Sequence, residues 1–299
     1  MSTVELPLQS LCDAAIEAAR AAGQVIQGAD RDSLVKRFKD VGSSAASQLV
    51  TEIDIQSEAV IRDILKDSSN RWDIAFVGEE SVERAQTERF ETHCFWCVDP
   101  LDGTLPFAEG RDGYAVSIAL VDRSGFPLIG VVYDPVEDSV LSALNGQGAV
   151  RDGETLVSRF TSSSSLLVYA DASFATDVER GPVHGLLEQC ARRAGLANVD
   201  IAYGSGAVKN ACQVLDHPNA CYLKLPKAED GGGSLWDFAA TTCIATEAGG
   251  WASDIRGLPL DLNRPDSTFM NHEGVLYASN EDIARDLIEA LGPICAETR

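Results

Sequence analysis

The chain has 299 residues, of which 45% are hydrophobic, and its 46 acidic residues against 24 basic ones give a formal net charge of -22. This acidic balance disfavours nucleic-acid polymers and anionic membranes as partners. There is no apolar run of about 18 residues and no basic, apolar leader, so we expect a soluble protein without a signal peptide. The eight cysteines are scattered and form no tight framework, which favours a reducing, cytoplasmic location.

Hydrophobic spacing and turn residues predict the elements in chain order. Apolar residues at helical spacing predict helices over 8–28 and 49–66, the second with Thr51 and Asp54 as candidate caps. Between them, the polar stretch 28–47 predicts a loop or hairpin. Short β-rich runs predict strands at 74–81 and 93–104 and a hairpin over 115–122 and 128–134.

Strands and helices alternate in the rest of the chain. We expect strands at 165–171 and 198–205, a helix over 181–195, a helix over 234–250 that two glycines stop, and a helix over 280–293 that Asn280 caps and Gly-Pro ends. The first part therefore resembles two helices beside an antiparallel sheet. We predict an N-terminal α+β half, residues 1–160, and a C-terminal α/β half, residues 161–299, with a packed interface because no flexible linker separates them.

Acidic side chains stand where predicted strands end or predicted helices begin: Asp54, Glu79, Glu80, Asp99, Asp102 and Asp237. Acids at element ends can converge on one cleft, where they repel one another unless cations neutralise them. Oxygen-only ligands select hard ions such as Mg²⁺ or Mn²⁺, and Mg²⁺ commonly pairs carboxylates with a substrate phosphate. The pattern therefore predicts a metal site for a small phosphorylated substrate.

The residues after Asp102 predict a phosphate site beside these acids. Pro106 fits the first turn of a helix, where its missing N–H costs nothing, and this places Thr104 near the N-cap. Free N–H groups and the positive end of the helix dipole then favour an anion. Two metal ions beside a bound phosphate can stabilise both the attacking water and the leaving oxygen of an in-line displacement.

Each of these features has an ordinary explanation when it is taken alone. A D-P-x-D-G sequence is usually a surface turn, paired glutamates after a strand are usually solvated, and Asp237 alone is typical of a helix cap. Their combination favours the metal site. A D-x-D-G-T nucleophile of the haloacid dehalogenase type is excluded, because Asp99 and Asp102 are three positions apart with a proline between them.

Together these motifs resemble those of the inositol monophosphatase superfamily, a group of Mg²⁺-dependent, lithium-sensitive phosphomonoesterases. The matching segments are "VTEID" (50–54), "VGEES" (77–81), "WCVDPLDGTLPFAEG" (96–110), "VSIALV" (116–121) and "LWDFAATTCIATEAGG" (235–250). The resemblance implies an α+β fold, a layered αβαβα sandwich, with the metal site in the first half and the second half completing it and binding substrate. It also implies two or three Mg²⁺ ions, with Mn²⁺ as a substitute.

The resemblance implies a role for each matching residue. One metal would be held by Glu79, Asp99 and the carbonyl of Leu101, and a second by Asp99, Asp102 and Asp237. Thr104 and Asp54 would orient and deprotonate the attacking water, while the N–H groups of Gly103 and Thr104 would hold the phosphate. Glu80 either supports the site or faces solvent. The stretch 222–236 is longer than usual and glycine-rich, so we expect residues 227–234 to form a loop over the cleft.

Two segments bear on the substrate. "YGSGAVKNACQVL" (203–215) resembles a segment of 3'(2'),5'-bisphosphate nucleotidases, and it suggests Ser205, Gly206 and Lys209 as substrate-binding residues. Lys224 stands where inositol phosphatases place an acid, and a second phosphate on the substrate would favour a cation there. We therefore predict hydrolysis of 3'-phosphoadenosine 5'-phosphate to AMP and phosphate. The alternatives are an inositol-1-monophosphatase or other sugar phosphatase, and solvated lysines without a role.

The remaining expectations concern the cysteines of the 93–104 strand, catalytic activity and oligomeric state. Cys94 and Cys97 could suggest zinc or redox chemistry, but strand geometry would point them to opposite faces and no second pair stands at ligand spacing. An inactive acidic metal-binding scaffold is the alternative of another class, and it predicts a lost ligand position, whereas all are filled. A homodimer is compatible with the sequence.

Overall fold

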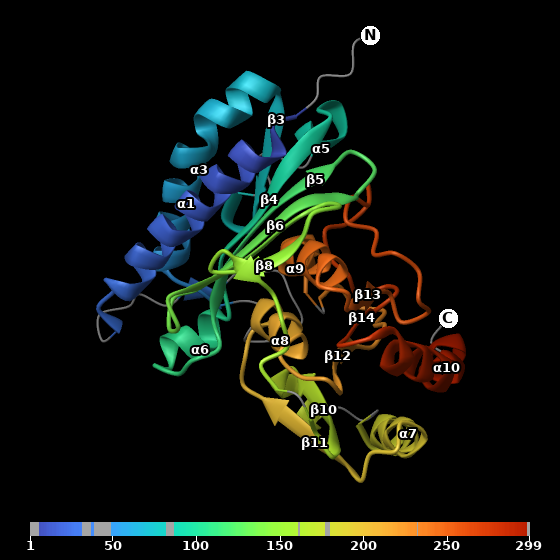
Figure 1. Ribbon diagram of the computed structural model, residues 1–299. Helices are drawn as coiled ribbons and strands as arrows, with labels where there is room; N and C mark the ends of the chain where they lie inside the picture. Colours follow the sequence, from blue (N-terminus) through green and yellow to red (C-terminus); the bar gives the residue numbers. More distant parts are fainter. Residues whose placement is uncertain are drawn as a thin grey trace.

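The structure is a computed structural model that describes residues 6–31, 37–38, 49–81, 87–160, 162–176, 180–231 and 233–297. Five layers alternate between helices and sheets (Figure 1). The outer helices of the first half are α1 (Leu8–Gln27) and α3 (Glu52–Trp72), and those of the second half are α7 (Arg180–Arg193) and α10 (Glu281–Glu297). Two helices, α8 (Ala207–Val214) and α9 (Leu235–Glu247), lie between the sheets. The predicted αβαβα sandwich is confirmed.

The larger sheet follows α1 and α3 on the chain and has the strand order β3-β4-β5-β6-β7-β8-β9. Its strands are β3 (Ile74–Gly78), β4 (Cys94–Asp102), β5 (Ala115–Asp122), β6 (Pro127–Asp134), β7 (Ser139–Leu144), β8 (Gly148–Arg151) and β9 (Glu154–Thr155). The pair β3–β4 is parallel and the other pairs are antiparallel. The sheet is therefore mixed and not purely antiparallel as expected. The segment from residue 79 to 93, which includes α5 (Glu88–Glu91), leads from the end of β3 back to the edge of the sheet where β3 starts, so β4 runs parallel to β3.

The smaller sheet has the order β11-β10-β12-β14-β13. Its strands are β10 (Ser165–Ala170), β11 (Asn198–Tyr203), β12 (Ala220–Lys224), β13 (Trp251–Ser253) and β14 (Val275–Ala278). Strand β10 pairs in parallel with β11 and with β12, so these three strands end at one edge. Short elements complete the fold: the pair β1 (Arg37–Phe38) and β2 (Leu49–Val50), η2 (Glu79–Ser81), α6 (Thr104–Ala108) and η3 (Ala172–Thr176). Most of the predicted loop or hairpin at 28–47 lies outside the described residues.

Three apolar clusters hold the layers together. One packs α1 and α3 on the larger sheet, one joins both sheets through α8 and α9, and one packs α7 and α10 on the smaller sheet. The middle cluster contains side chains of both halves, so the expected packed interface exists. In the first cluster, Gly23 of α1 lets Tyr133 approach, because a Cβ at Gly23 would lie 1.9 Å from the Tyr133 ring. The division into domains at residue 160 remains a prediction.

The ends of the helices test the cap predictions. Asn280 accepts a hydrogen bond from the Ile283 N–H at 3.0 Å, as expected of a cap. Helix α10 nevertheless continues through Gly292 and Pro293 to Glu297, so the predicted end is wrong. A proline removes only one helical hydrogen bond, and the helix is also held by packing of residues such as Leu291. Within the described residues, no helix is long and apolar enough to cross a membrane.

Candidate active site

Three predicted acids meet at the edge of the larger sheet where β3 and β4 end. Asp99, Asp102 and Asp237 each offer a carboxylate oxygen, and these oxygens all lie within 4.8 Å of one another. Asp99 and Asp102 are 1% and 7% exposed, and both belong to β4, whereas Asp237 comes from α9 in the next layer. The site therefore lies between the larger sheet and the helices that separate the two sheets.

Capping interactions orient two of the acids. The Thr51 N–H donates to Asp54 Oδ2 at 2.8 Å, so the carboxylate of Asp54 closes the first turn of α3. In the same way the Ser234 N–H donates to Asp237 Oδ2 at 2.7 Å at the start of α9. Each carboxylate thus uses one oxygen for its helix and keeps the other for the site. The cap of α9 is Ser234, and Asp237 completes its capping box while also belonging to the acid cluster.

Thr104 links Asp54 to the acid cluster. Its hydroxyl lies 3.0 Å from Asp54 Oδ1 and 3.1 Å from the carbonyl oxygen of Leu101, and it can donate its hydrogen to either. The Leu101 N–H in turn donates to Asp99 Oδ1 at 3.0 Å. These contacts bring Asp54 and Thr104 together beside the acids.

Helix α8 approaches the cluster through Asp102. The N–H groups of Ala207 and Val208 donate to the two Asp102 oxygens at 3.0 and 2.9 Å. Gly206 makes this approach possible, because a Cβ there would lie 2.3 Å from Asp102 Oδ2. Gly206 therefore lies beside Asp102, and Ser205 directly precedes it; substrate contacts of both residues remain predictions. Gly103 has a φ of 82°, a left-handed conformation that suits glycine, and it stands directly before α6.

Glu79 belongs to the same group of charges. It begins the turn η2 directly after β3. Burial is the main cause that raises the pKa values of Asp54, Asp99 and Asp237, and repulsion from the Glu79 carboxylate adds to it. Its neighbour Glu80 has its N–H bound to the carboxylate of Glu58 at 2.7 Å. The backbone after Glu79 is therefore anchored to α3.

Burial and mutual repulsion make the carboxylates costly to ionise without cations. Burial raises the pKa of Asp99 well above its usual range, and the neighbouring carboxylates, Glu79 first, raise it further. Burial and repulsion from Asp237 raise the pKa of Asp102. Burial also raises the pKa of Asp237 to about 6, against the opposing effect of Lys224. A buried donor set made of oxygens alone fits a hard divalent cation, which would offset this repulsion.

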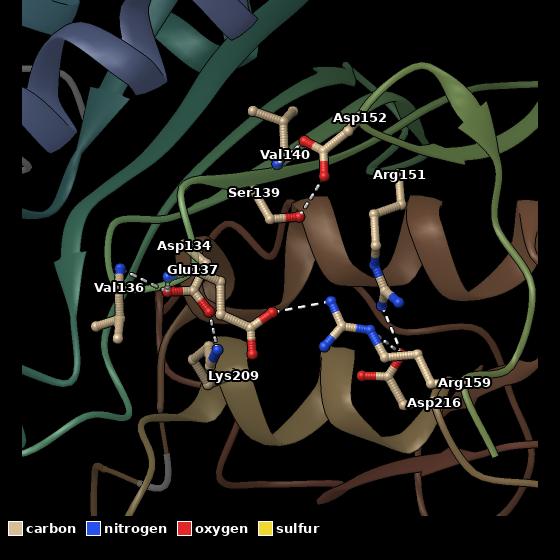
Figure 2. A network of polar contacts seen from close by, with 10 residues as sticks. All are labelled: Asp134, Val136, Glu137, Ser139, Val140, Arg151, Asp152, Arg159, Lys209 and Asp216. Atoms are coloured by element: carbon tan, nitrogen blue, oxygen red, sulfur yellow. Dashed lines mark hydrogen bonds and ion pairs between the residues drawn. The ribbon is translucent and has the colours of Figure 1, made fainter.

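The two predicted substrate lysines are both paired with carboxylates. Lys224 Nζ lies 2.9 Å from Asp171 Oδ2, and its side chain is 13% exposed. Lys209 pairs with Asp134, as Figure 2 shows, at a cavity of about 240 Å³ that Gly113 and Ser205 also line. No local sequence pattern indicates either carboxylate partner.

The cysteines at 94 and 97 lie on opposite faces of β4, as expected: Cys94 belongs to the cluster under α1 and α3, and Cys97 to the cluster between the sheets. Burial raises the pKa of the Cys94 thiol to about 11 and that of Cys97 well above its ordinary value. Both thiols are therefore protonated near neutral pH. Within the described residues, the group with metal-ligand spacing is the aspartate cluster and contains no cysteine.

Sequence reasoning missed three residues that hold the site. Glu58, Asp171 and Ser234 bind Glu80, Lys224 and Asp237 respectively. Ser234 could have been found, because S-x-x-D before an apolar run is a capping pattern. Glu58 and Asp171 act across the fold, so no local pattern indicates them.

Comparisons with known proteins identify the class. A model described as the inositol monophosphatase family matches residues 7–291. Inositol monophosphatase 1 of Sus scrofa is 31% identical and is aligned over 86% of this chain and 87% of its own. Inositol-1-monophosphatase of Synechocystis is 32% identical over 95% of this chain and 89% of its own. A structure of inositol monophosphatase II from Staphylococcus aureus has a TM-score of 0.72 at 21% identity, covers 97% of this chain and 98% of its own, and shares the fold.

The fold, the acid cluster and these matches define a metal-dependent phosphoric monoester hydrolase. The chain belongs to the inositol monophosphatase family, as the sequence motifs predicted.

Proposed function

We propose that this chain hydrolyses the monophosphate ester of a small polyol, such as inositol 1-phosphate or a related sugar phosphate. The observation that carries this proposal is the convergence of Asp99, Asp102 and Asp237 beside the Asp54–Thr104 pair. The similar proteins named as inositol monophosphatases support the same substrate class. The proposal reverses the order of the sequence prediction, which ranked a bisphosphate nucleotide first.

The proposed ligands of the two ions follow the sequence prediction: Glu79, Asp99 and the Leu101 carbonyl for one, and Asp99, Asp102 and Asp237 for the other. Divalent ions bound there, Mg²⁺ or Mn²⁺, would activate a water for attack on phosphorus and stabilise the leaving oxygen. A donor set of carboxylates and one carbonyl suits either ion.

The chain's own groups have defined tasks in this proposal. Asp54 Oδ1 accepts a hydrogen bond from Thr104, which leaves lone pairs of the threonine oxygen to accept one from the attacking water. Asp54 is then the final proton acceptor. The N–H groups of Gly103 and Thr104 would bind the phosphate oxygens, and Ser205 and Gly206 would contact the organic part of the substrate.

The second candidate is the 3'(2'),5'-bisphosphate nucleotidase that the sequence predicted. Lys224 supports it, because it is a cation that interacts electrostatically with Asp237 and Asp102 of the acid cluster. Lys209 supports it less, since the cavity that it lines includes none of the three clustered aspartates. Cytoplasmic location, a homodimer and a loop at 227–234 that covers the cleft all remain predictions.

The test is phosphate release from inositol 1-phosphate and from 3'-phosphoadenosine 5'-phosphate, each with EDTA, Mg²⁺ or Mn²⁺. We expect metal-dependent release, faster from inositol 1-phosphate. Faster release from the bisphosphate would favour the second candidate. Release from neither, nor from a panel of sugar phosphates, would favour the inactive metal-binding scaffold and overturn the proposal.

A further inference from the structure

A lysine and an aspartate form an ion pair beside the acid cluster. Lys224 is the last residue of β12, and Asp171 directly follows β10. Because β10 and β12 are parallel neighbours, the two residues end at the same edge of the smaller sheet. There Lys224 Nζ lies 2.9 Å from Asp171 Oδ2. The pair joins two strands that are far apart in sequence.

Surrounding side chains hold both partners in place. The ammonium of Lys224 lies 5.4 Å from the centre of the Phe238 ring, and its side chain is 13% exposed. The Tyr222 hydroxyl donates to Asp171 Oδ1 at 3.0 Å, and the Asn210 amide lies 3.5 Å from the same oxygen. The Asp171 side chain remains 32% exposed. The pair is thus held by side chains of β12, α8 and α9, the helix that also carries Asp237, and its carboxylate is the more accessible partner.

The charge of Lys224 is already balanced before a substrate binds. Burial lowers the pKa of Lys224, but Asp171 first and then Asp237 raise it by more, so the net shift is upward and the residue stays an ammonium. Its nearest opposite charge is the Asp171 carboxylate. A leaving group that enters here meets a neutral pair, with acceptor oxygens on Asp171 and donor hydrogens on Lys224. Hydroxyl groups match both partners.

We propose that Asp171 determines substrate specificity: by neutralising Lys224 it favours a leaving group with hydroxyls and disfavours one with a second phosphate. This inference rests on the proposed phosphatase function and deepens it. A second phosphate would lie against the Asp171 carboxylate, or would have to displace it from Lys224, and either arrangement costs free energy. Without the negative charge at residue 171, Lys224 becomes a free phosphate-binding cation.

The chain offers a control in the Arg151–Asp216 ion pair (Figure 2), whose side chains are 16% and 14% exposed. Neither residue lines the cavity that Lys209 and Ser205 line. Asp216→Asn removes the same charge, frees no lysine there, and keeps an oxygen that can accept from Arg151. Asp171→Asn likewise keeps an acceptor for the Tyr222 hydroxyl.

The experiment measures kcat/KM for 3'-phosphoadenosine 5'-phosphate and for inositol 1-phosphate in the wild type and both variants. The ratio of the two values cancels the fraction of folded enzyme. We expect Asp171→Asn to raise this ratio by about tenfold or more, as one charge-assisted hydrogen bond would. We expect Asp216→Asn to change it by less than about twofold, because this variant removes a charge without altering the Lys224–Asp171 pair. Asp171→Ser replaces Asp171→Asn if thermal melting shows the latter unfolded.

The outcomes separate the two proposals. If the wild type releases phosphate from neither ester with metal present, the proposed function fails. If the wild type is active and Asp171→Asn leaves the ratio unchanged, the role of Asp171 is refuted while the function stands. An equal rise in both variants also refutes it, because the change would then reflect the general loss of negative charge.

Discussion

Replacing Gly78 with alanine tests how Glu79 is held at the site. A Cβ at Gly78 would lie 2.3 Å from Glu58 Oε2 and 2.5 Å from its Cδ. Nonbonded atoms prefer separations of about 3.5 Å, so the carboxylate would have to retreat by about 1 Å. Glu58 is 5% exposed and accepts the Glu80 N–H at 2.7 Å, and that bond would be lost. The turn that carries Glu79 would then lose its anchor to α3.

The expected cost is that of one buried, charge-assisted hydrogen bond, about 1.5–3 kcal/mol of unfolding free energy. The free energy is measured by urea denaturation without metal. A Mg²⁺ titration followed by calorimetry should show weaker binding, since the proposed ligand Glu79 is less well positioned. Gly185→Ala in α7 is the control, because nothing lies within 4 Å of a Cβ there. Unchanged stability and Mg²⁺ affinity in Gly78→Ala would refute the anchoring role of Glu58.

Three further predictions concern the acids and the thiols. Asp99→Asn should reduce the rate of phosphate release by about a thousandfold or more, because it removes a proposed metal ligand. The melting temperature of the metal-free protein should stay equal or rise, because the variant removes a repelling charge. An unchanged rate would exclude Asp99 from the mechanism. Burial raises the pKa of Asp237 from 3.8 to about 6, so the folded chain binds this proton more tightly than the unfolded chain. With EDTA present, the unfolding free energy should therefore rise as pH falls from about 7 to about 5. A free energy that falls over this range would contradict a raised pKa of Asp237 in the folded chain. Cys94 is buried with its pKa raised to about 11, so a disulfide reagent at about pH 8 should modify it only after unfolding, and rapid modification of the native protein would contradict its burial.

Local motifs carried most of what the sequence could predict. The acids lie directly after strands or at helix starts, so the pattern around Asp99, Asp102 and Asp237 indicated both the elements and their convergence. The layered fold followed from the same motifs. Asp54 could be placed because a cap position fixes a side chain relative to its own helix.

Contacts between residues that are far apart in the sequence could not be predicted. Asp171 meets Lys224 only because β10 and β12 are parallel neighbours, and nothing near either residue in the sequence indicates that register. The substrate ranking depended on this point, since Lys224 considered alone looks like a free cation. The end of α10 was missed because packing holds the helix beyond the point where Gly292 and Pro293 favour a stop.

The capping contacts of Asp54 and Asp237 have a consequence for how ions enter the site. Each carboxylate is oriented by a backbone N–H at the start of its own helix, which lies 2.8 Å from Asp54 Oδ2 and 2.7 Å from Asp237 Oδ2. This orientation does not depend on a bound ion. An arriving cation therefore meets a preorganised Asp237, and the attacking water a preorganised Asp54, so binding costs little additional conformational entropy. When the cation dissociates, the first turns of both helices keep their capping hydrogen bonds. Metal ions can therefore bind and dissociate repeatedly without any refolding of these helix ends.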